Sequence, residues 1–354
     1  MKTLLFISDK DEKFNHSFIE NVINGFLKRY FKIYCVYFTD SFTIKENQIF
    51  ILKKDRSRAL ELINQHFLDL KNVDFIIIRN FLDVLKNAVK LKKKYDFKLY
   101  FQLSFPHFYR SYHEAKIRGK NLLFKFVKYR INLILYKNLI NQCDGFFPIS
   151  NLMKKEFFDD IKTSVLALPL GINTKDITKP LQKSGVKKFI YIGAIDINRQ
   201  MDDFFNEFCK ARSEFRLEIY TKDYEYAKTI LPKDSRIVLH HAVSKDEIFN
   251  IMREFDVGCF YVPINRLYDL CSPTKVMDYY SCGLVGFSSA VGECRELFDD
   301  KTMFFIGNNI AGMVEKICVT SRDELCNMAK NGLEILINKR NYESIADEIR
   351  EFLK

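Results

Sequence analysis

The sequence predicts an α/β protein built from two tandem doubly wound, Rossmann-like domains. Short apolar runs alternate with longer helical patterns, a polar segment at 171–188 interrupts them once, and the alternation then restarts. A length of 354 residues suits about two domains. We therefore expect domains at 1–172 and 173–335, and a C-terminal helix at 336–354 that packs back on the first domain.

The strand candidates are continuous apolar runs, as in parallel strands covered on both faces. Because ligands bind at the carboxyl ends of such strands, two such domains predict a cleft with one ligand on each side. Helices are expected over 15–29, 57–70, 81–94 and 115–141, and from about 308 onwards. The expected strands are 3–8, 32–38, 74–79, 98–104, 145–150 and 164–170 in the first domain, and 188–193, 216–221, 236–241, 256–262 and 283–289 in the second.

The net charge of +11 is unevenly distributed. Residues 1–180 carry 32 basic and 18 acidic residues, whereas residues 181–354 carry 24 and 27. This asymmetry indicates an anionic partner for the first domain, either nucleic acid or an anionic membrane surface. A lysine-rich solvated surface is the alternative.

The nine cysteines form no C-x-x-C pair, which indicates a reduced, cytoplasmic protein without structural zinc. The apolar run at 4–8 is too short for a signal-peptide core. No run approaches the 18 apolar residues of a membrane-spanning helix, so any membrane contact is expected to be peripheral.

The segment CSPTKVMDYYSCG (271–283) predicts an anion site at a helix start. Ser272 stands at the expected N-cap, Pro273 is suited to the first turn, and Lys275 adds a full positive charge. Asp278 lies on nearly the same helical face and is placed to accept hydrogen bonds from a ribose, and Gly283 ends the helix. The alternative is an ordinary capped helix with a surface Lys–Asp pair.

The segment KFIYIGAIDINRQMDDFF (188–205) predicts a strand that ends at Gly193, a polar loop and a helix that begins near Met201. Glycine permits close backbone approach, and Arg199, just before the helix, is suited to grip phosphate oxygens with two parallel hydrogen bonds. A simple turn with a solvated arginine is the alternative.

The order of these motifs resembles the nucleotide-sugar-binding domain of GT-B glycosyltransferases of the group 1, or family 4-like, type. SPTKVMDYYSCGLVGFSS is similar to the family pattern S-P-x-K-x-x-E-Y-x-A-x-G-x-P-V-x-x-S, and SKDEIFNIMREFDVGCFYVP (244–263) resembles the segment before it. CDGFFPISNLMKKEF (143–157) and VLALPLGINTKDI (165–177) resemble motifs at the end of the first domain in the same families.

The resemblance implies that Lys275 and Arg199 hold the donor diphosphate, with Asp278 on the ribose and His241 and Ala242 near the base. Asp278 replaces the usual Glu, and Leu270 replaces the first Glu of the E-x7-E pattern, so retention and inversion both stay open. The implied donor-binding set is Gly193, Arg199, Thr221, His241, Ala242, Ser272, Pro273, Thr274, Lys275 and Asp278.

No D-x-D motif stands in the second domain, which favours a metal-independent mechanism without a cofactor. Fixed cations and helix starts would then stabilise the charge that builds on the leaving diphosphate.

In the first domain, the acidic residues Asp9, Asp11 and Glu12 follow the first strand, and His107 follows the fourth. A near-neutral imidazole suits a general base or a hydrogen bond to the sugar, and relatives often carry a His here. His107, Asp9 and Glu114 are the catalytic candidates, with His113 beside them. A solvated loop and a structural histidine are the alternatives.

Residues 116–138 (KIRGKNLLFKFVKYRINLILYKN) form a basic amphipathic segment suited to an anionic lipid surface. Its alternative is a domain helix with a basic outer face. No nucleic-acid-binding module is recognised.

The function implied is a glycosyltransferase that moves a sugar from a nucleotide donor to a cell-surface glycan or lipid-linked saccharide, as in lipopolysaccharide or capsule synthesis. The expected location is the cytoplasm or the inner face of the cell membrane. A non-catalytic GT-B-like subunit and a nucleotide-sugar epimerase are the alternatives.

Overall fold

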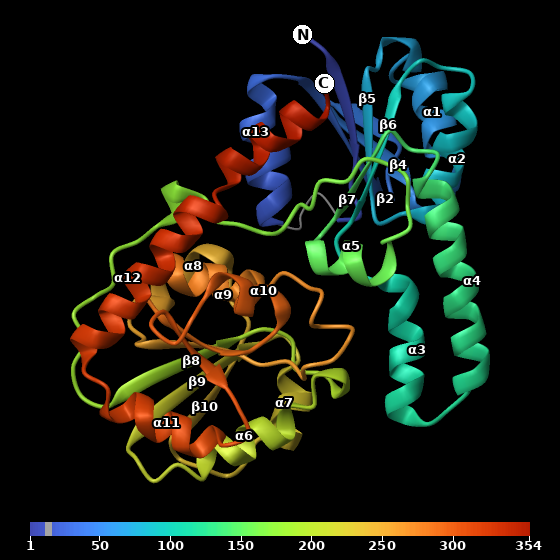
Figure 1. The fold of residues 1–354 in the computed structure, drawn as a ribbon. Helices are drawn as coiled ribbons and strands as arrows, with labels where there is room; N and C mark the ends of the chain where they lie inside the picture. The colour runs from blue at the N-terminus through green and yellow to red at the C-terminus, as the bar shows by residue number, and fades with distance from the viewer. Residues whose placement is uncertain (11–15) are drawn as a thin grey trace. The chain divides into compact units, whose positions relative to one another are not determined.

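The computed structural model describes residues 1–10 and 16–354 (Figure 1). The chain forms two compact units, one of Met1–Pro169 with Tyr342–Lys354 and one of Leu170–Asn341. The borders therefore lie at 169/170 and 341/342, where we expected 172/173 and 335/336. Helix α13 (Tyr342–Phe352) belongs to the first unit because it packs on the turns η1 (Ile19–Ile23) and η2 (Phe26–Arg29).

The first unit is built on a seven-stranded sheet of order β3-β4-β2-β1-β5-β6-β7, parallel except for the β3–β4 pair. The short strands β3 and β4 were not predicted. The strand predicted at 164–170 is not formed as a regular strand. This stretch runs beside β7 through the Phe146–Val165 bridge and through hydrogen bonds from the Leu166 and Leu168 amides to the Phe146 and Pro148 carbonyls. The strands are β1 (Thr3–Ile7), β2 (Lys32–Thr39), β3 (Thr43–Lys45), β4 (Gln48–Leu52), β5 (Phe75–Arg79), β6 (Lys98–Leu103) and β7 (Gly145–Pro148).

The helix predicted at 115–141 is wrong as a single element. Gly119 and Asn121 adopt left-handed backbone conformations (φ 65° and 55°) and turn the chain back between two antiparallel helices, α3 and α4. The α-helices of this unit other than α13 are α1 (Ala59–His66), α2 (Leu82–Lys92), α3 (His107–Arg118), α4 (Leu122–Ile140) and α5 (Asn151–Phe157).

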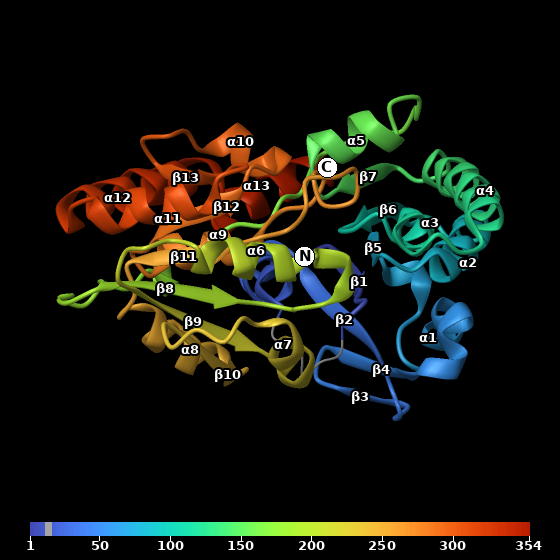
Figure 2. The same cartoon turned by 90° about the horizontal axis from the view of Figure 1, so that it is seen from below.

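The second unit is built on a six-stranded, wholly parallel sheet of order β10-β9-β8-β11-β12-β13. Figure 2 shows β8, β9 and β10 side by side. The edge strand β13 was not predicted. The strands are β8 (Lys187–Ile192), β9 (Phe215–Thr221), β10 (Ile237–His241), β11 (Val257–Phe260), β12 (Val285–Ser289) and β13 (Met303–Ile306).

Helices cover both faces of the second sheet. In Figure 1, α8 and α9 lie above it and α6 and α11 below it, and each pair closes a separate apolar core. The helices of this unit are α6 (Met201–Cys209), α7 (Tyr224–Ile230), α8 (Lys245–Met252), α9 (Thr274–Ser281), α10 (Gly292–Leu297), α11 (Ile310–Val319) and α12 (Arg322–Lys339).

The fold class is confirmed as two parallel-sheet, Rossmann-like units. In each sheet the strand order reverses once, between β1 and β5 in the first unit and between β8 and β11 in the second. Ligands of doubly wound sheets bind at the carboxyl edge beside such a switch point. Among the described helices, none is long and apolar enough to cross a bilayer.

Candidate functional site

The carboxyl end of β8 holds Arg199 in place. Its Nη1 donates a hydrogen bond to the Tyr191 hydroxyl (3.3 Å), and that hydroxyl donates to the carbonyl oxygen of Ala194 (2.8 Å). A Cβ atom at Gly193 would lie only 3.3 Å from the same hydroxyl and 3.6 Å from Arg199 Nη1. The turn after β8 thus lies directly against a guanidinium whose side chain keeps 24% of its surface exposed.

Helix α9 is pinned at the switch point by one tyrosine. The Tyr279 hydroxyl accepts a hydrogen bond from the Ile192 amide at the end of β8 (3.1 Å) and donates one to the Cys259 carbonyl of β11 (2.9 Å). Close approach requires glycine at position 258, where a Cβ atom would lie 2.1 Å from the Tyr279 ring. Tyr279 therefore holds the second half of α9 against the ends of β8 and β11.

The start of α9 differs from the expected one. The predicted cap at Ser272 is wrong: the N-cap is Pro273, which has no side-chain acceptor, and Ser272 Oγ accepts from the Leu170 amide (3.1 Å). A helix start without a side-chain cap has its first amides available to an anion. Gly283 follows the helix with φ 76°, as predicted.

Thr274 and Lys275 occupy the first turn of α9. Lys275 Nζ lies 3.0 Å from Asp278 Oδ2, so the two residues assigned to the diphosphate and the ribose form an ion pair. The Lys275 side chain is 36% exposed and that of Asp278 17%. Pairing of this kind within a helix is weak, because solvent screens it.

Electrostatics connects Arg199 with the segment that precedes α9. Burial raises the pKa of the Cys271 thiol to about 12, and the Arg199 charge is among the influences that oppose this rise. The Arg199 charge therefore acts on the segment that leads into α9.

A buried carboxyl supports this segment and was not predicted. Glu293 of α10 is 2% exposed and accepts a hydrogen bond from Arg340 Nε (2.9 Å). Burial raises its pKa, against the opposing influence of Arg340 and the Ser272 hydroxyl. The pattern E-C-R-E that begins at Glu293 is typical of a surface helix, so the sequence carries no local signal that this carboxyl is buried.

Thr221, His241 and Ala242 gather at the ends of β9 and β10. The Ala242 amide donates to the Thr221 carbonyl (3.0 Å), and the His241 ring stacks on Tyr224 at 3.9 Å. The Thr221 hydroxyl accepts from the Asp223 amide (3.0 Å). The three residues are therefore neighbours at the same carboxyl edge as Gly193.

The switch point of the first unit holds a buried charge cluster. Asp9, just after β1, forms an ion pair with Arg79 at the end of β5 and accepts a hydrogen bond from Asn80 Nδ2 (2.6 Å). Arg79 is 2% exposed, and its Nη2 lies 3.1 Å from His16 Nε2. Of these residues only Asp9 was predicted; the predicted Asp11 and Glu12 lie outside the described residues.

Burial and charge set the ionisation of this cluster. Burial and the neighbouring Arg79 charge lower the pKa of His16 to about 3. For Asp9, burial acts to raise the pKa, but Arg79, Lys10 and Asn80 together hold it below its ordinary value. The cluster therefore contains an ionised carboxylate, a guanidinium and a neutral imidazole at pH 7.

His107 lies close enough to Asp9 for their charges to interact. Burial is the main cause that lowers its pKa, so the imidazole is neutral at pH 7. Glu114, further along α3, pairs with Arg110 (2.9 Å), and His113 is buried on the same helix. Of the three catalytic candidates, Asp9 is paired with Arg79 and Glu114 with Arg110, and the Asp9 charge acts on His107.

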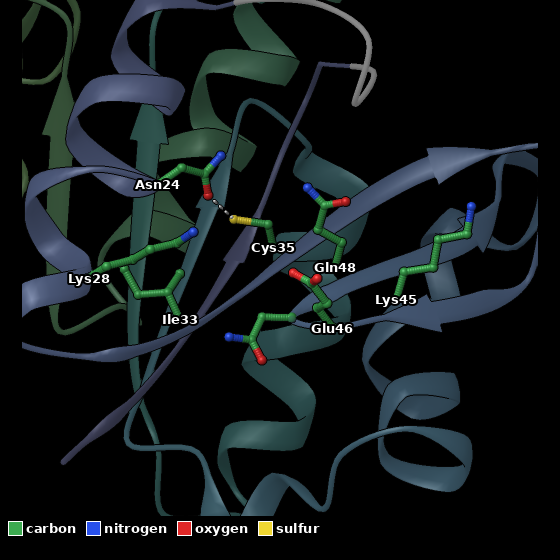
Figure 3. A pocket seen from close by; sticks show the side chains of 8 residues that line it. Asn24, Lys28, Ile33, Cys35, Lys45, Glu46 and Gln48 are labelled. Carbon is green, nitrogen blue, oxygen red and sulfur yellow. Dashed lines mark hydrogen bonds between the residues drawn. The ribbon is translucent and has the colours of Figure 1, made fainter.

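A cavity of about 320 Å³ lies at the other end of the first sheet (Figure 3). It is lined from η1, η2 and the first residues of β2 and β4, among them Asn24, Lys28 and Gln48. Cys35 donates to Asn24 Oδ1 (3.1 Å), and burial raises the pKa of its thiol to about 12. This thiol is protonated, and the cavity is separate from the carboxyl edge of the first sheet.

Residues 199–351 match the family model described as glycosyl transferase-like. No curated protein matches the sequence significantly. Among solved structures, sucrose-phosphate synthase from Thermosynechococcus elongatus superposes with a TM-score of 0.71 at 12% identity, covering 99% of this chain and 98% of that one.

HepE of Anabaena in complex with UDP and glucose gives a TM-score of 0.70 at 11% identity, covering 100% and 99%. The apo lipopolysaccharide outer core galactosyltransferase WaaB gives 0.63 at 13%, covering 99% of each chain. These likenesses confirm the predicted GT-B fold, and the family match agrees with the predicted enzyme class.

Proposed function

We propose that this chain is a glycosyltransferase of the GT-B type. Its second unit would bind a nucleoside diphosphate sugar, and its first unit would bind a saccharide acceptor. The observation that carries this proposal is the placement of Arg199 at the end of β8, beside the β8–β11 switch point against which Tyr279 holds α9. The two cations Arg199 and Lys275, with a helix start that lacks a side-chain cap, match the charge of a diphosphate.

The proposed reaction breaks the bond between the sugar's anomeric carbon and the diphosphate oxygen, and the diphosphate leaves with the bonding electrons. Arg199, Lys275 and the first amides of α9 would stabilise this developing charge, with no metal required. Asp278, released from Lys275 by the diphosphate, would accept hydrogen bonds from the ribose. The acceptor oxygen bonds to the anomeric carbon and loses its proton.

His107 is our candidate for the group that takes this proton or hydrogen-bonds the sugar. Its imidazole is neutral because burial lowers its pKa, so its free ring nitrogen can accept a proton at pH 7. Asp9 is held by Arg79, and Glu114 by Arg110, which makes both poorer candidates.

The comparisons guide the choice of donor and acceptor. HepE is described with UDP and glucose, and WaaB as a lipopolysaccharide galactosyltransferase. We therefore propose that the donor is a UDP-hexose and that the acceptor is a cell-surface glycan or a lipid-linked saccharide.

The test is a thermal-shift and calorimetric panel with UDP, GDP and ADP. We expect UDP to raise the melting temperature, and Arg199→Ala and Lys275→Ala each to weaken its binding about tenfold or more, since each removes a charged hydrogen-bond donor. Lys301→Ala, at an exposed lysine of the same unit, is the matched control. A melting temperature that none of the three nucleotides changes would refute the donor site.

Product analysis distinguishes the remaining classes. Slow release of UDP from UDP-hexose by the purified chain supports a transferase. Conversion of the donor sugar to its epimer supports an epimerase, and binding without turnover supports a non-catalytic subunit.

A further inference from the structure

Helix α4 carries an unusual outer surface. Eight of its large apolar side chains are exposed, and Leu123 and Phe124 are 77% and 67% exposed. Monomeric proteins rarely expose a contiguous apolar surface of this kind without a partner. We call these side chains the apolar face of α4: Leu122, Leu123, Phe124, Phe126, Val127, Ile131, Ile134 and Leu135.

Most of the apolar face lies away from the side on which α4 packs, although the half-exposed ring of Phe126 also contacts Tyr112 of α3 at 5.4 Å. Tyr129, Leu133 and Tyr136 bury the inner side, with Tyr129 stacked on Tyr112 of α3 at 5.5 Å. Val127, Ile131 and Ile134 recur at helical spacing away from them, so their shared side points outward. A helix packed on one side normally carries polar residues on the other, so the expected basic outer face is replaced by an apolar one.

The most exposed end of the apolar face lies at the tip of the α3–α4 hairpin. The turn between α3 and α4 lies at the end of this hairpin most distant from β6 and β7 (Figure 1). Phe108 also stacks on Tyr129 at 6.2 Å, which ties the two helices together. The most exposed apolar residues, Leu123 and Phe124, follow this turn directly.

Basic residues surround the apolar face. Residues 107–140 contain eight lysines and arginines and one acidic residue, Glu114, which pairs with Arg110. Lys128 flanks the face along one side and Arg130 along the other, and the half-buried Lys125 precedes Lys128 by one turn, nearer the packed side. Two copies of this chain joined through this face would bring like charges together, whereas an anionic lipid surface would pair with them.

We propose that the apolar face of α4 inserts into the headgroup and acyl boundary of an anionic membrane, with Lys125, Lys128 and Arg130 on the lipid headgroups. Apolar side chains on a helix with flanking cations suit this interfacial mode. The surface lies within the first unit alone, so the proposal stands independently of the donor site.

The test is flotation of the full chain with vesicles of phosphatidylcholine, with or without phosphatidylglycerol. We expect binding only with phosphatidylglycerol, and weaker binding at high salt. Lys125→Gln with Lys128→Gln should weaken it about tenfold or more, and Leu123→Ser with Phe124→Ser should abolish it. Val186→Ser with Val319→Ser, at exposed apolar residues of the second unit, is the matched control and should bind as the unaltered chain does.

Insertion can be read directly because the chain contains no tryptophan. Phe124→Trp should show a blue-shifted emission with anionic vesicles, and Tyr226→Trp in the second unit should show none. Retention of the thermal melting profile verifies folding of each variant.

Equal binding by the Leu123→Ser with Phe124→Ser variant, or no binding by the unaltered chain, would overturn the proposal. A dimer in solution that the same variant converts to a monomer, without vesicle binding, would assign the face to a second copy instead.

Discussion

The switch points of the two sheets occupy the same position in each unit but carry differently arranged charges. At the switch point of the first sheet, Asp9 and Arg79 form an ion pair, and both side chains are almost wholly buried. At the switch point of the second, Arg199 has the Tyr191 hydroxyl and a more distant Asp196 carboxylate (3.9 Å), and Lys275 has a partly exposed pair with Asp278.

The difference shows that the switch point of a doubly wound sheet can either fix a loop or bind a ligand. A buried, internally paired charge cluster fixes the geometry of a loop, but it has little charge left for a ligand. Partly exposed cations beside a helix start retain the capacity to bind an anion. The first cluster is therefore expected to govern stability, and the second to govern ligand affinity.

Replacing the buried arginine is expected to have the largest effect. Arg79→Met leaves the mostly buried Asp9 carboxylate with only Asn80 and the more distant Lys10 (3.7 Å), which should destabilise the first unit by about 3 kcal/mol. Hydrogen exchange of the β1 amides measures this loss. The matched variant in the second unit, Arg199→Met, should change stability far less while it removes the UDP-induced thermal shift.

The double variant Asp9→Asn with Arg79→Met is the control, because it removes both charges and should recover much of the lost stability. Equal destabilisation by Arg79→Met and Arg199→Met would contradict the contrast between the two switch points.

Acidification should act next most strongly, and on the first unit. The pKa of His16 is about 3 in the folded state, below its ordinary 6.5, because burial and Arg79 disfavour the imidazolium. The unfolded chain therefore binds more protons as the pH falls from about 6.5, and the first unit should lose about 2–3 kcal/mol between pH 6.5 and 4.5. The lowered pKa of Asp9 adds to the loss below about pH 4.

Comparing exchange in β1 with exchange in β8 across this pH range measures the effect. His16→Gln should flatten the dependence, whereas His66→Gln, at an exposed histidine of α1, should leave it unchanged. A dependence that survives His16→Gln would assign the loss to another group.

Gly258→Ala should cost about 2 kcal/mol, since the new Cβ would overlap the Tyr279 ring and push α9 from the sheet. Chemical denaturation followed in the second unit measures this cost, and UDP binding should weaken with it. Gly307→Ala, where a Cβ meets no atom of the described structure within 4 Å, is the control and should be nearly neutral.

The smallest effect concerns helix starts. Ser150 Oγ caps α5 by accepting from the Met153 amide (3.0 Å), so Ser150→Ala should cost about 1 kcal/mol and speed exchange of that amide. Ser272→Ala should instead speed exchange of the Leu170 amide. Faster exchange confined to the first turn of α9 would show that Ser272 caps this helix after all.

Much of the fold was predictable because parallel strands leave continuous apolar runs. The runs at 32–38 and 216–221 became β2 and β9. The short edge strands β3, β4 and β13 carry weaker patterns and were missed, and the 164–170 run was misassigned because apolarity alone does not specify pairing. The helix predicted as continuous over 115–141 is interrupted at Gly119, which adopts a left-handed conformation.

The sequence alone determined that the second unit carries Gly193, Arg199 and an SPTK helix start, because glycine, proline and charge act locally on the chain. Only the tertiary structure decided what each of these groups touches. Ser272, predicted as a helix cap, accepts a hydrogen bond from the Leu170 amide instead. Arg79 and Asn80 bind Asp9 from the neighbouring strand, and His16 contacts Arg79. Such contacts join residues distant in sequence, and their strength depends on burial, which no local pattern records.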